Sequence, residues 1–258
     1  MSATETLKQR LLAGQKQLGV IALLPSPDVA EILAGTGIDV AMIDQEHGSG
    51  GLRDFVAQDR AIRGGALRAM VRVPHGELTY AQRLLDNGCR ALVFPGIDTA
   101  AQAEAAVRAC FYPPRGHRGA GSGLRSANHG MDGGYYAPEA EDGTLIVAQI
   151  ESAAAVANID AICAVPGVDM LLIGPRDLSA TLGKLGRLDD PEVRGLIDHA
   201  AARIKAAGKL LACTLLPGKT VAQMFDEGFD LVLAGKEVDF LIEGGRALAA
   251  LKQSPNGD

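Results

Sequence analysis

Short apolar runs recur along the chain, and amphipathic stretches separate them. Each run is almost continuously apolar, which is typical of parallel strands that are buried on both faces. We therefore expect eight strands, at residues 20–24, 38–43, 67–73, 91–94, 145–150, 168–173, 210–213 and 231–233.

Helical spacing of apolar residues appears between these runs. Residues 100–111 keep a period of 3.6 after a potential cap at Asp98 or Thr99, residues 155–163 follow the potential cap Ser152, and residues 193–204 show the same period. Strand and helix alternate through the whole chain. This pattern predicts an α/β fold, a (β/α)8 TIM-type barrel that forms one domain over residues 1–258. A doubly wound open sheet is the alternative.

Composition and charge exclude several function classes. The 258 residues carry a formal net charge of −6 and 4% aromatic residues without tryptophan. Clustered cations for nucleic acid and aromatic platforms for stacking bases are therefore not expected. No apolar run reaches the ~20 residues of a membrane helix, and the polar N-terminus has no signal-peptide core. We expect a cytoplasmic protein that binds neither membrane nor nucleic acid.

The four cysteines lie among apolar neighbours and form no CxxC pair. They are Cys89, Cys110, Cys163 and Cys213. We expect buried, reduced thiols.

Polar residues gather where several predicted strands end. The sequence DQEHG at 44–48 follows the second run, Arg72 lies in the third, Gln149 and Glu151 end the fifth, and GPRD at 174–177 follows the sixth. In a barrel these carboxyl ends share one rim, where active sites form. Singly, each residue could be a solvated charge or a helix cap. Together they predict one site.

Two of these residues suit a hard metal ion. Glu151 and Asp177 could bind a divalent cation through oxygen, with water and substrate completing its coordination. Such an ion polarises a carbonyl and stabilises an enolate. Gln149 could donate a hydrogen bond to a substrate oxygen. The alternatives are that Asp177 caps the helix beginning near Leu178 and that Glu151 only complements a helix dipole.

The remaining polar residues suit proton transfer. Histidine is the side chain best suited to proton transfer near neutral pH, so His47 could serve as a general base, and Asp44, three residues earlier, could orient its imidazole. Arg72 is a permanent cation that could hold a developing oxyanion. A metal ion, a base and an oxyanion clamp together predict proton abstraction beside a carbonyl, or carbon–carbon cleavage to an enolate.

Five motifs in order resemble the HpcH/HpaI aldolases, the metal-dependent (class II) pyruvate aldolases. They are DQEHG at 44–48, VRVP at 71–74, YPPRGHRG at 112–119, QIE at 149–151 and GPRDLS at 174–179. The resemblance extends from about residue 8 to residue 251. It implies reversible cleavage of 4-hydroxy-2-keto acids to an aldehyde and pyruvate, or a close 2-keto acid such as hydroxypyruvate.

The resemblance also implies a cofactor and an assembly. The cofactor is a divalent ion, Mg²⁺, Mn²⁺ or Co²⁺. The assembly is a homo-hexamer, a trimer of dimers with a swapped C-terminal helix.

Residue roles carry over from the matching motifs. Glu151 and Asp177 would be the metal ligands, and His47 would be the acid/base, held by Asp44. Arg72 would bind the keto or enolate oxygen and stabilise its charge.

Further roles concern the substrate and a neighbouring subunit. Asp86 matches an acidic position that projects into a neighbour's site. Backbone N–H groups around Arg176 and Asp177 would receive the substrate carboxylate. The residues expected to bind the 2-keto acid are Gln149, Arg72, Gly174, Pro175 and Arg176.

Two positions concern the aldehyde. Arg176 stands where the family commonly has small or neutral side chains, so it could favour a carboxylated or hydroxylated aldehyde, or turn out to solvent. Leu215 follows a predicted strand and either lines the aldehyde pocket or packs in the core. The segment 124–129 also departs from the family pattern.

Other mechanisms remain open at this point. A Schiff-base aldolase would need a desolvated lysine, and Lys236 after the last predicted strand is the candidate. The same metal–enolate site could decarboxylate oxaloacetate, or the protein could bind keto acids without catalysis. The irregular stretch 113–143 is expected to be functional or mobile, with Arg118 and Arg125 as solvated charges or as contacts for an anion or subunit.

Overall fold

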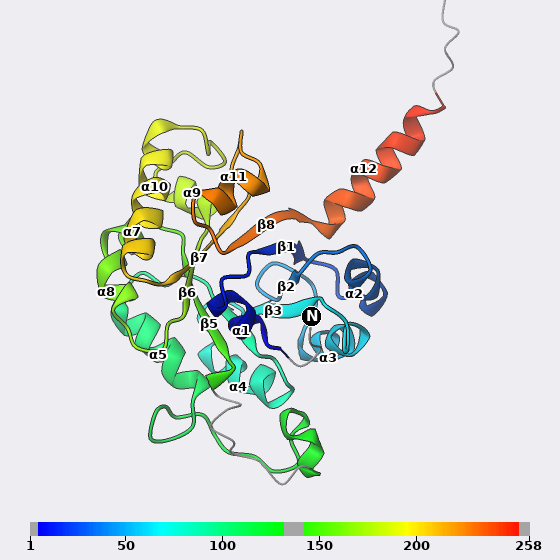
Figure 1. The fold of residues 1–258 in the computed structure, drawn as a ribbon, viewed down its shortest axis with the longest axis vertical. Coiled ribbons are helices and arrows are strands. Elements are labelled where there is room, and N and C mark those ends of the chain that lie inside the picture. The colour runs from blue at the N-terminus through cyan, green and yellow to red at the C-terminus, as the bar shows by residue number, and fades with distance from the viewer. Residues whose placement is uncertain (1–4, 132–141, 253–258) are drawn as a thin grey trace, which may run out of the picture.

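Eight parallel strands close into a barrel in chain order (Figure 1). The structure is a computed structural model that describes residues 5–131 and 142–252. Closure confirms the barrel and excludes the open sheet. The strands are β1 (Gln17–Ala22), β2 (Val40–Asp44), β3 (Arg68–Arg72), β4 (Ala91–Phe94), β5 (Leu145–Ile150), β6 (Met170–Ile173), β7 (Leu210–Thr214) and β8 (Leu231–Lys236).

Helices surround the barrel and connect successive strands (Figure 1). The predicted helices at 100–111 and 193–204 are present, and Thr99, not Asp98, caps the first of them. The described segments are α1 (Leu7–Leu12), α2 (Pro27–Ala34), α3 (Leu52–Ala61), α4 (Leu78–Asp86), α5 (Ala100–Cys110), η1 (Arg125–Gly130), α7 (Ala153–Ala157), α8 (Ile159–Cys163), α9 (Pro175–Thr181), α10 (Pro191–Ala206), α11 (Val221–Asp226) and α12 (Glu237–Ala250).

The helix expected at 155–163 divides in two at Asn158. Ser152 caps α7 as predicted, by accepting a hydrogen bond from the N–H of Ala155. The backbone of Asn158 has φ −99° and ψ 8°, which is not helical, and its side chain donates to the carbonyl of Asp98 at 2.8 Å. The side chain of Asn158 therefore fixes the break by bonding to the loop before α5.

Strand ends differ from the apolar runs because hydrogen-bonded pairing sets them. β1 begins at the polar Gln17, which pairs with Leu231 of β8, three residues before the predicted start at 20. β6 begins at Met170, two residues after the predicted start at 168, because Val168 turns back to bond Val165. β4 and β5 match their predicted ranges.

Alternate strand residues point into the barrel lumen. Met42, Met70 and Val147 belong to one buried cluster, and it is separate from the cluster that packs beneath the helices. Side chains alternate with period two along a strand. Asp44, Arg72 and Gln149 each lie two residues beyond one of these three, so their side chains enter the lumen at its carboxyl end.

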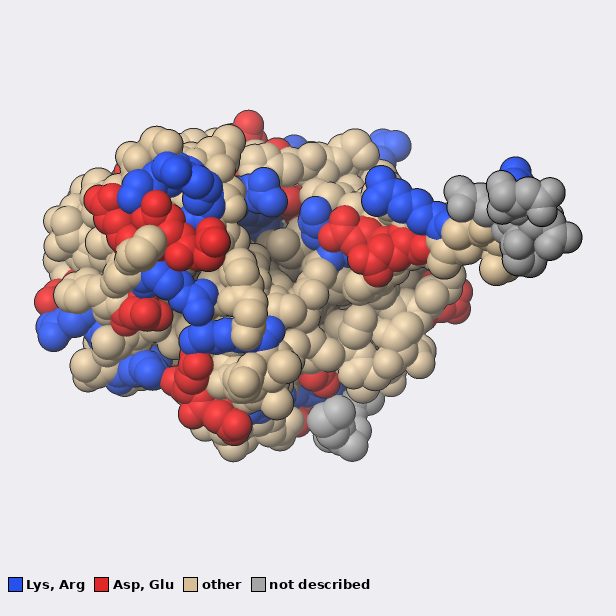
Figure 2. Space-filling model, turned by 90° about the horizontal axis from the view of Figure 1, so that it is seen from above, with Lys and Arg blue, Asp and Glu red and all other residues tan. Residues whose placement is uncertain are grey.

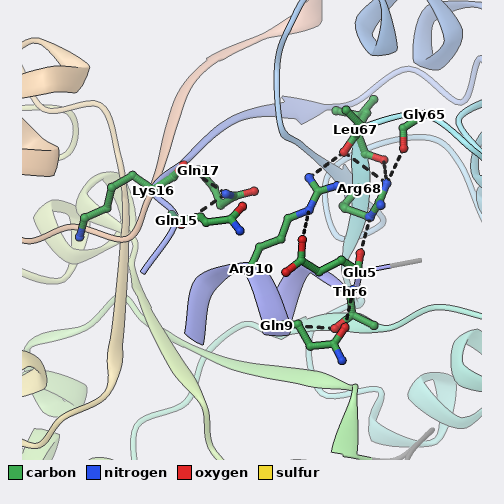
Figure 3. A network of polar contacts seen from close by, with 11 residues as sticks. Glu5, Thr6, Gln9, Arg10, Gln15, Lys16, Gln17, Gly65, Leu67 and Arg68 are labelled. Atoms are coloured by element: carbon green, nitrogen blue, oxygen red, sulfur yellow. Dashed lines mark hydrogen bonds and ion pairs between the residues drawn. The ribbon is translucent and has the colours of Figure 1, made fainter. Parts of the chain in front are cut away.

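Helix α1 closes the opposite end of the barrel. Leu7 and Leu11 join the lumen cluster, and Arg10 is fully buried. Its guanidinium donates to the carbonyl of Ala66 at 2.8 Å and lies 3.9 Å from a Glu5 carboxylate oxygen (Figure 3). With this end sealed, a substrate can reach the lumen only from the carboxyl ends of the strands.

Arginines anchor the described part of the irregular stretch to the barrel helices. Arg118 forms an ion pair with Asp86 at 2.5 Å, and Arg125 forms one with Asp59. Both arginine side chains are less than a tenth exposed, so they are structural contacts and not solvated charges. Residues 132–141 of this stretch lie outside the described residues.

All four cysteines are free and buried, as predicted. Burial raises the pKa of the Cys89 and Cys213 thiols to about 12, which keeps them protonated. Within the described ranges, every helix is too short or too polar to span a bilayer.

A matched pair of leucines tests the packing. Leu211 in β7 is fully buried and Leu185 is 66% exposed. Leu211→Ala should lower the free energy of unfolding by about 2–5 kcal/mol, because it leaves a cavity in the core. Leu185→Ala should change it by less than about 0.5 kcal/mol. Urea denaturation measures both, and equal effects would contradict the assignment of this core.

Candidate active site

A pocket of about 550 Å³ opens at the carboxyl end of the barrel. Figure 2 shows a hollow near the centre of one face, with Lys and Arg atoms beside it. Residues from β1, β2, β3 and from β5 to β8 line the pocket. The size suits a small-molecule site. The strand ends that carry Asp44, Arg72, Gln149 and the segment 174–177 thus share one rim, and Glu151 lies outside this lining.

An ion pair between neighbouring strands forms the base of the pocket. Arg72 Nε donates to Asp44 Oδ1 at 3.0 Å, and Nη2 donates to Oδ2 at 2.6 Å. The two residues are register partners on β2 and β3, and both are buried. Burial alone raises the pKa of Asp44, but the hydrogen bonds and charge of Arg72 outweigh it and lower the pKa below its usual value.

Asp44 does not orient the His47 imidazole, contrary to expectation. Its Oδ1 accepts the backbone N–H groups of Glu46 at 3.0 Å and His47 at 3.2 Å, while Arg72 occupies the rest of the carboxylate. Asp44 thus fixes the backbone turn that carries His47. The His47 side chain lines the pocket and is 61% exposed, as suits a group that exchanges protons with substrate.

Glu46 is a residue that the sequence reasoning passed over. Its carboxylate lies 3.3 Å from Arg72 Nη1, 3.8 Å from His47 Nε2 and 3.9 Å from His75 Nδ1. Its place inside the DQEHG motif, between two residues that were assigned roles, was the available signal.

Glu151 lies close to two other carboxylates. Its Oε1 accepts the N–H of Gly96 at 2.6 Å, and its Oε2 accepts a hydrogen bond from Gln149. Burial raises the pKa of Glu151, and the charges of Glu46 and Asp177 add to this against the opposing hydrogen bonds. The concentration of negative charge here would be relieved by a bound cation.

Two glycines leave room for the side chains of Glu151 and His75. A Cβ on Gly174 would lie 3.0 Å from Glu151 Cβ, and a Cβ on Gly96 would meet the His75 ring at 2.1 Å. Gly96 also has φ +65°, a conformation that other residues rarely adopt. Side chains at these two positions would push Glu151 or His75 out of place.

The donor set fits a magnesium-like ion held by few protein ligands. Glu151 follows β5 and Asp177 lies in the first turn of α9, so the two carboxylates come from separate strand ends. Within the described residues, no cluster of three or more His, Cys, Asp or Glu is arranged to hold a metal. Mg²⁺ commonly takes one or two carboxylates and fills its other positions with water and substrate oxygens.

Asp177 is not the cap of α9, because Gly174 occupies that position. The pocket lining also includes Pro175, Arg176 and Leu215. Leu215 additionally packs against the buried core. Asp86 lies outside the lining, paired with Arg118.

Lys236 lines the pocket but is not desolvated. Its side chain is 43% exposed, and Nζ lies 3.4 Å from Asp239. A Schiff-base lysine is activated by burial or by another cation, whereas Lys236 is exposed and lies beside a carboxylate. The geometry therefore disfavours the Schiff-base alternative.

Comparisons with known proteins agree with this geometry. The family model of the HpcH/HpaI aldolase/citrate lyases matches residues 17–243. The chain is 38% identical to a hydroxypyruvate/pyruvate aldolase of Agrobacterium fabrum, over 94% of this chain and 91% of the relative. It is 42% identical to a 4-hydroxy-2-oxovalerate aldolase of Novosphingobium aromaticivorans, over 89% and 87%.

A solved structure shares the fold closely. A family protein from Burkholderia cenocepacia matches with a TM-score of 0.89 and 36% identity, over 96% of this chain and 99% of that one. Family and relatives together show an aldolase-type lyase, and they set aside a protein that only binds keto acids.

The Asp44–Arg72 pair should make stability depend on pH. Asp44→Asn should lower the free energy of unfolding by about 3 kcal/mol at pH 7, because Arg72 loses its buried counter-charge. The folded pKa of Asp44 is lowered, so its contribution is complete above the unfolded value of about 3.9 and is lost as pH falls through the folded value. The difference between variant and wild type should therefore shrink below about pH 4.

Urea titrations at pH 7 and at pH 3 measure this difference. The matched control is Asp28→Asn, since Asp28 is exposed on α2. It should change stability by less than about 0.5 kcal/mol at pH 7. An Asp44→Asn variant as stable as wild type at pH 7 would contradict the prediction.

Proposed function

Because the chain belongs to the HpcH/HpaI aldolase/citrate lyase family, we propose that it reversibly cleaves 4-hydroxy-2-keto acids to a 2-keto acid and an aldehyde. The 2-keto acid is pyruvate or hydroxypyruvate, in keeping with the names of the relatives. The observation that carries the proposal is the oriented guanidinium of Arg72 at the base of the pocket. Arg72 also lies 3.3 Å from the Glu46 carboxylate, and the exposed side chain of His47 lines the same pocket.

Glu151 and Asp177 would hold a divalent cation, Mg²⁺, Mn²⁺ or Co²⁺. When bound, such an ion polarises the keto carbonyl and offsets the charge of the enolate. Burial raises the pKa of Glu151, and the charges of Glu46 and Asp177 add to this. A bound cation would offset these unfavourable terms, which supports the proposal.

Arg72 binds the keto oxygen in this proposal. The Asp44 carboxylate accepts hydrogen bonds from Nε and from one N–H of Nη2, which holds the guanidinium plane in place. Other N–H groups of Arg72 remain for a ligand. Gln149 touches the same keto acid from β5. The N–H groups of Arg176 and Asp177, in the first turn of α9, have no partners within the helix and would receive the carboxylate.

His47 moves the proton. In the addition direction, it takes a proton from the carbon next to the keto group, and that carbon forms a bond to the aldehyde carbon. The aldehyde oxygen then takes up a proton and becomes the 4-hydroxyl group. Cleavage runs the same steps in reverse. Glu46, 3.8 Å from His47 Nε2, would stabilise the imidazolium formed on the way.

The C-terminal helix supports assembly. Helix α12 projects away from the barrel (Figure 1), and its exposed apolar side chains include Phe240, Leu241 and Leu248. An exposed apolar patch of this kind marks an interaction surface. We propose that it packs on another copy in a cytoplasmic homo-hexamer, a trimer of dimers, with Asp86 facing a neighbour's site.

Exchange of the keto-acid protons tests the function without any aldehyde. Wild-type protein in D₂O should exchange the pyruvate methyl protons when Mg²⁺ or Mn²⁺ is present, and should lose this exchange after chelation. Glu151→Gln and Asp177→Asn should weaken metal binding, with partial rescue by excess metal. NMR follows the methyl signal, and direct metal titration follows binding.

Two outcomes would contradict this proposal. Exchange that survives complete chelation would rule out the metal role. Absence of exchange with both pyruvate and hydroxypyruvate, in metal-loaded protein, would rule out either compound as the nucleophile.

A pair of histidines tests the base. His47→Ala should slow exchange by about 10²–10⁴-fold, as loss of a general base does. His75 also lies beside Glu46 and is similarly exposed, but it does not line the pocket. His75→Ala should therefore change the exchange rate less than about threefold relative to wild type, as measured by the same NMR assay. Equal losses in both variants would remove His47 from the role of base.

A further inference from the structure

Three cations line the pocket, and they differ in how they are paired. Arg72 is buried and bound by Asp44 and Glu46. Lys236 is near Asp239 at 3.4 Å. Arg176 is exposed, and among the described residues its side chain forms no ion pair and no hydrogen bond. Among the residues that the structure describes, the guanidinium of Arg176 therefore has no carboxylate partner.

The pocket changes character from base to mouth. Polar groups on the strands, Arg72 and Gln149, occupy the lumen. Leu188 and Leu215 lie in the segments after β6 and β7 and provide apolar lining. Arg176 lies on the first turn of α9, beyond the end of β6 and outside the lumen. The reacting groups thus lie in the lumen, and Arg176 and the apolar side chains line the pocket beyond the strand ends.

We infer that Arg176 binds an anionic group, a carboxylate or a phosphate, at the far end of the acceptor aldehyde. The inference rests on the proposed function and names the substrate class of its second reactant. A guanidinium matches either anion with two parallel N–H donors. The aldehyde would be short-chained, with its carbonyl at one end and its anion at the other.

The reaction itself sets the direction of the aldehyde. The new bond joins the carbon next to the keto group to the aldehyde carbon, so the aldehyde carbonyl must point toward the keto acid at Arg72 and Gln149. The rest of the aldehyde then extends toward the mouth. A pocket of about 550 Å³ exceeds what a three-carbon keto acid alone needs, so it leaves room for such a tail.

Matched acceptors measure the contribution of the charge. Succinic semialdehyde and its methyl ester share a chain and differ in the terminal charge, and glyceraldehyde 3-phosphate and glyceraldehyde form a second pair. With metal restored and pyruvate saturating, wild type should show a higher kcat/KM for the charged member of at least one pair. The pair that shows it distinguishes a carboxylate from a phosphate.

Substitutions assign that preference to Arg176. Arg176→Ala should lower the charged-to-neutral ratio of kcat/KM about tenfold, as loss of a hydrogen bond to a charged group does. Arg176→Lys should keep part of the preference for the charged acceptor, because lysine retains the positive charge without the two parallel N–H donors. The matched control is Arg187→Ala, an exposed arginine after α9 that does not line the pocket, and it should leave the ratio unchanged.

Three results would overturn the inference. If wild type exchanges pyruvate protons and Arg176→Ala leaves kcat/KM unchanged for both the charged and the neutral acceptor, the side chain faces solvent, and the proposed function stands. Equal losses with charged and neutral acceptors would place Arg176 at the keto acid or in the fold. If metal-loaded wild type exchanges no protons with either keto acid, the proposed function fails and the inference fails with it.

Discussion

The buried ion pair between Asp44 and Arg72 is the interaction on which the site depends. A buried arginine is costly unless a carboxylate and hydrogen bonds accompany it. Register places the two residues side by side on β2 and β3, so each compensates the burial of the other. Asp44 Oδ1, which accepts a hydrogen bond from Arg72, also accepts hydrogen bonds from the backbone N–H groups of Glu46 and His47. One carboxylate therefore holds the guanidinium of Arg72 and also shapes the turn that carries His47.

The fold follows from features that are local in sequence. Strands buried on both faces need nearly continuous apolar runs, and those runs are visible without any knowledge of the fold. The polar exceptions are also readable, because they fall at the ends of runs and keep the period of two that leads into the lumen. Gln149 interrupts an apolar run, and in a barrel the open end of the lumen is where such a polar side chain finds polar surroundings. The structure places it in the pocket there. The strands and the polar rim at their carboxyl ends were thus predictable from the sequence.

The interaction partners of the polar side chains were less predictable from the sequence than their positions in the fold. His47 is three residues from Asp44 and Arg72 is 28 residues away, so chain spacing favoured the wrong partner. The register of β2 with β3 decides the matter, and register arises only when the barrel closes. Asp86 and Arg118 are a similar case, joined across 32 residues. The break at Asn158 depends on the carbonyl of Asp98, which no helical period could reveal.

The position of each group in the barrel also separates chemistry from selectivity. Arg72 and Gln149 lie on strands that neighbours hold on both sides, so they can move little and suit a step that needs fixed donors. Arg176 and Leu215 follow the strands, in segments whose side chains can change without disturbing the ladder of hydrogen bonds. A substitution at the rim can therefore change the charge and shape of the pocket mouth while Arg72 and Gln149 keep their geometry. In the proposed function, such a change would act on the aldehyde and leave the groups that bind the keto acid in place.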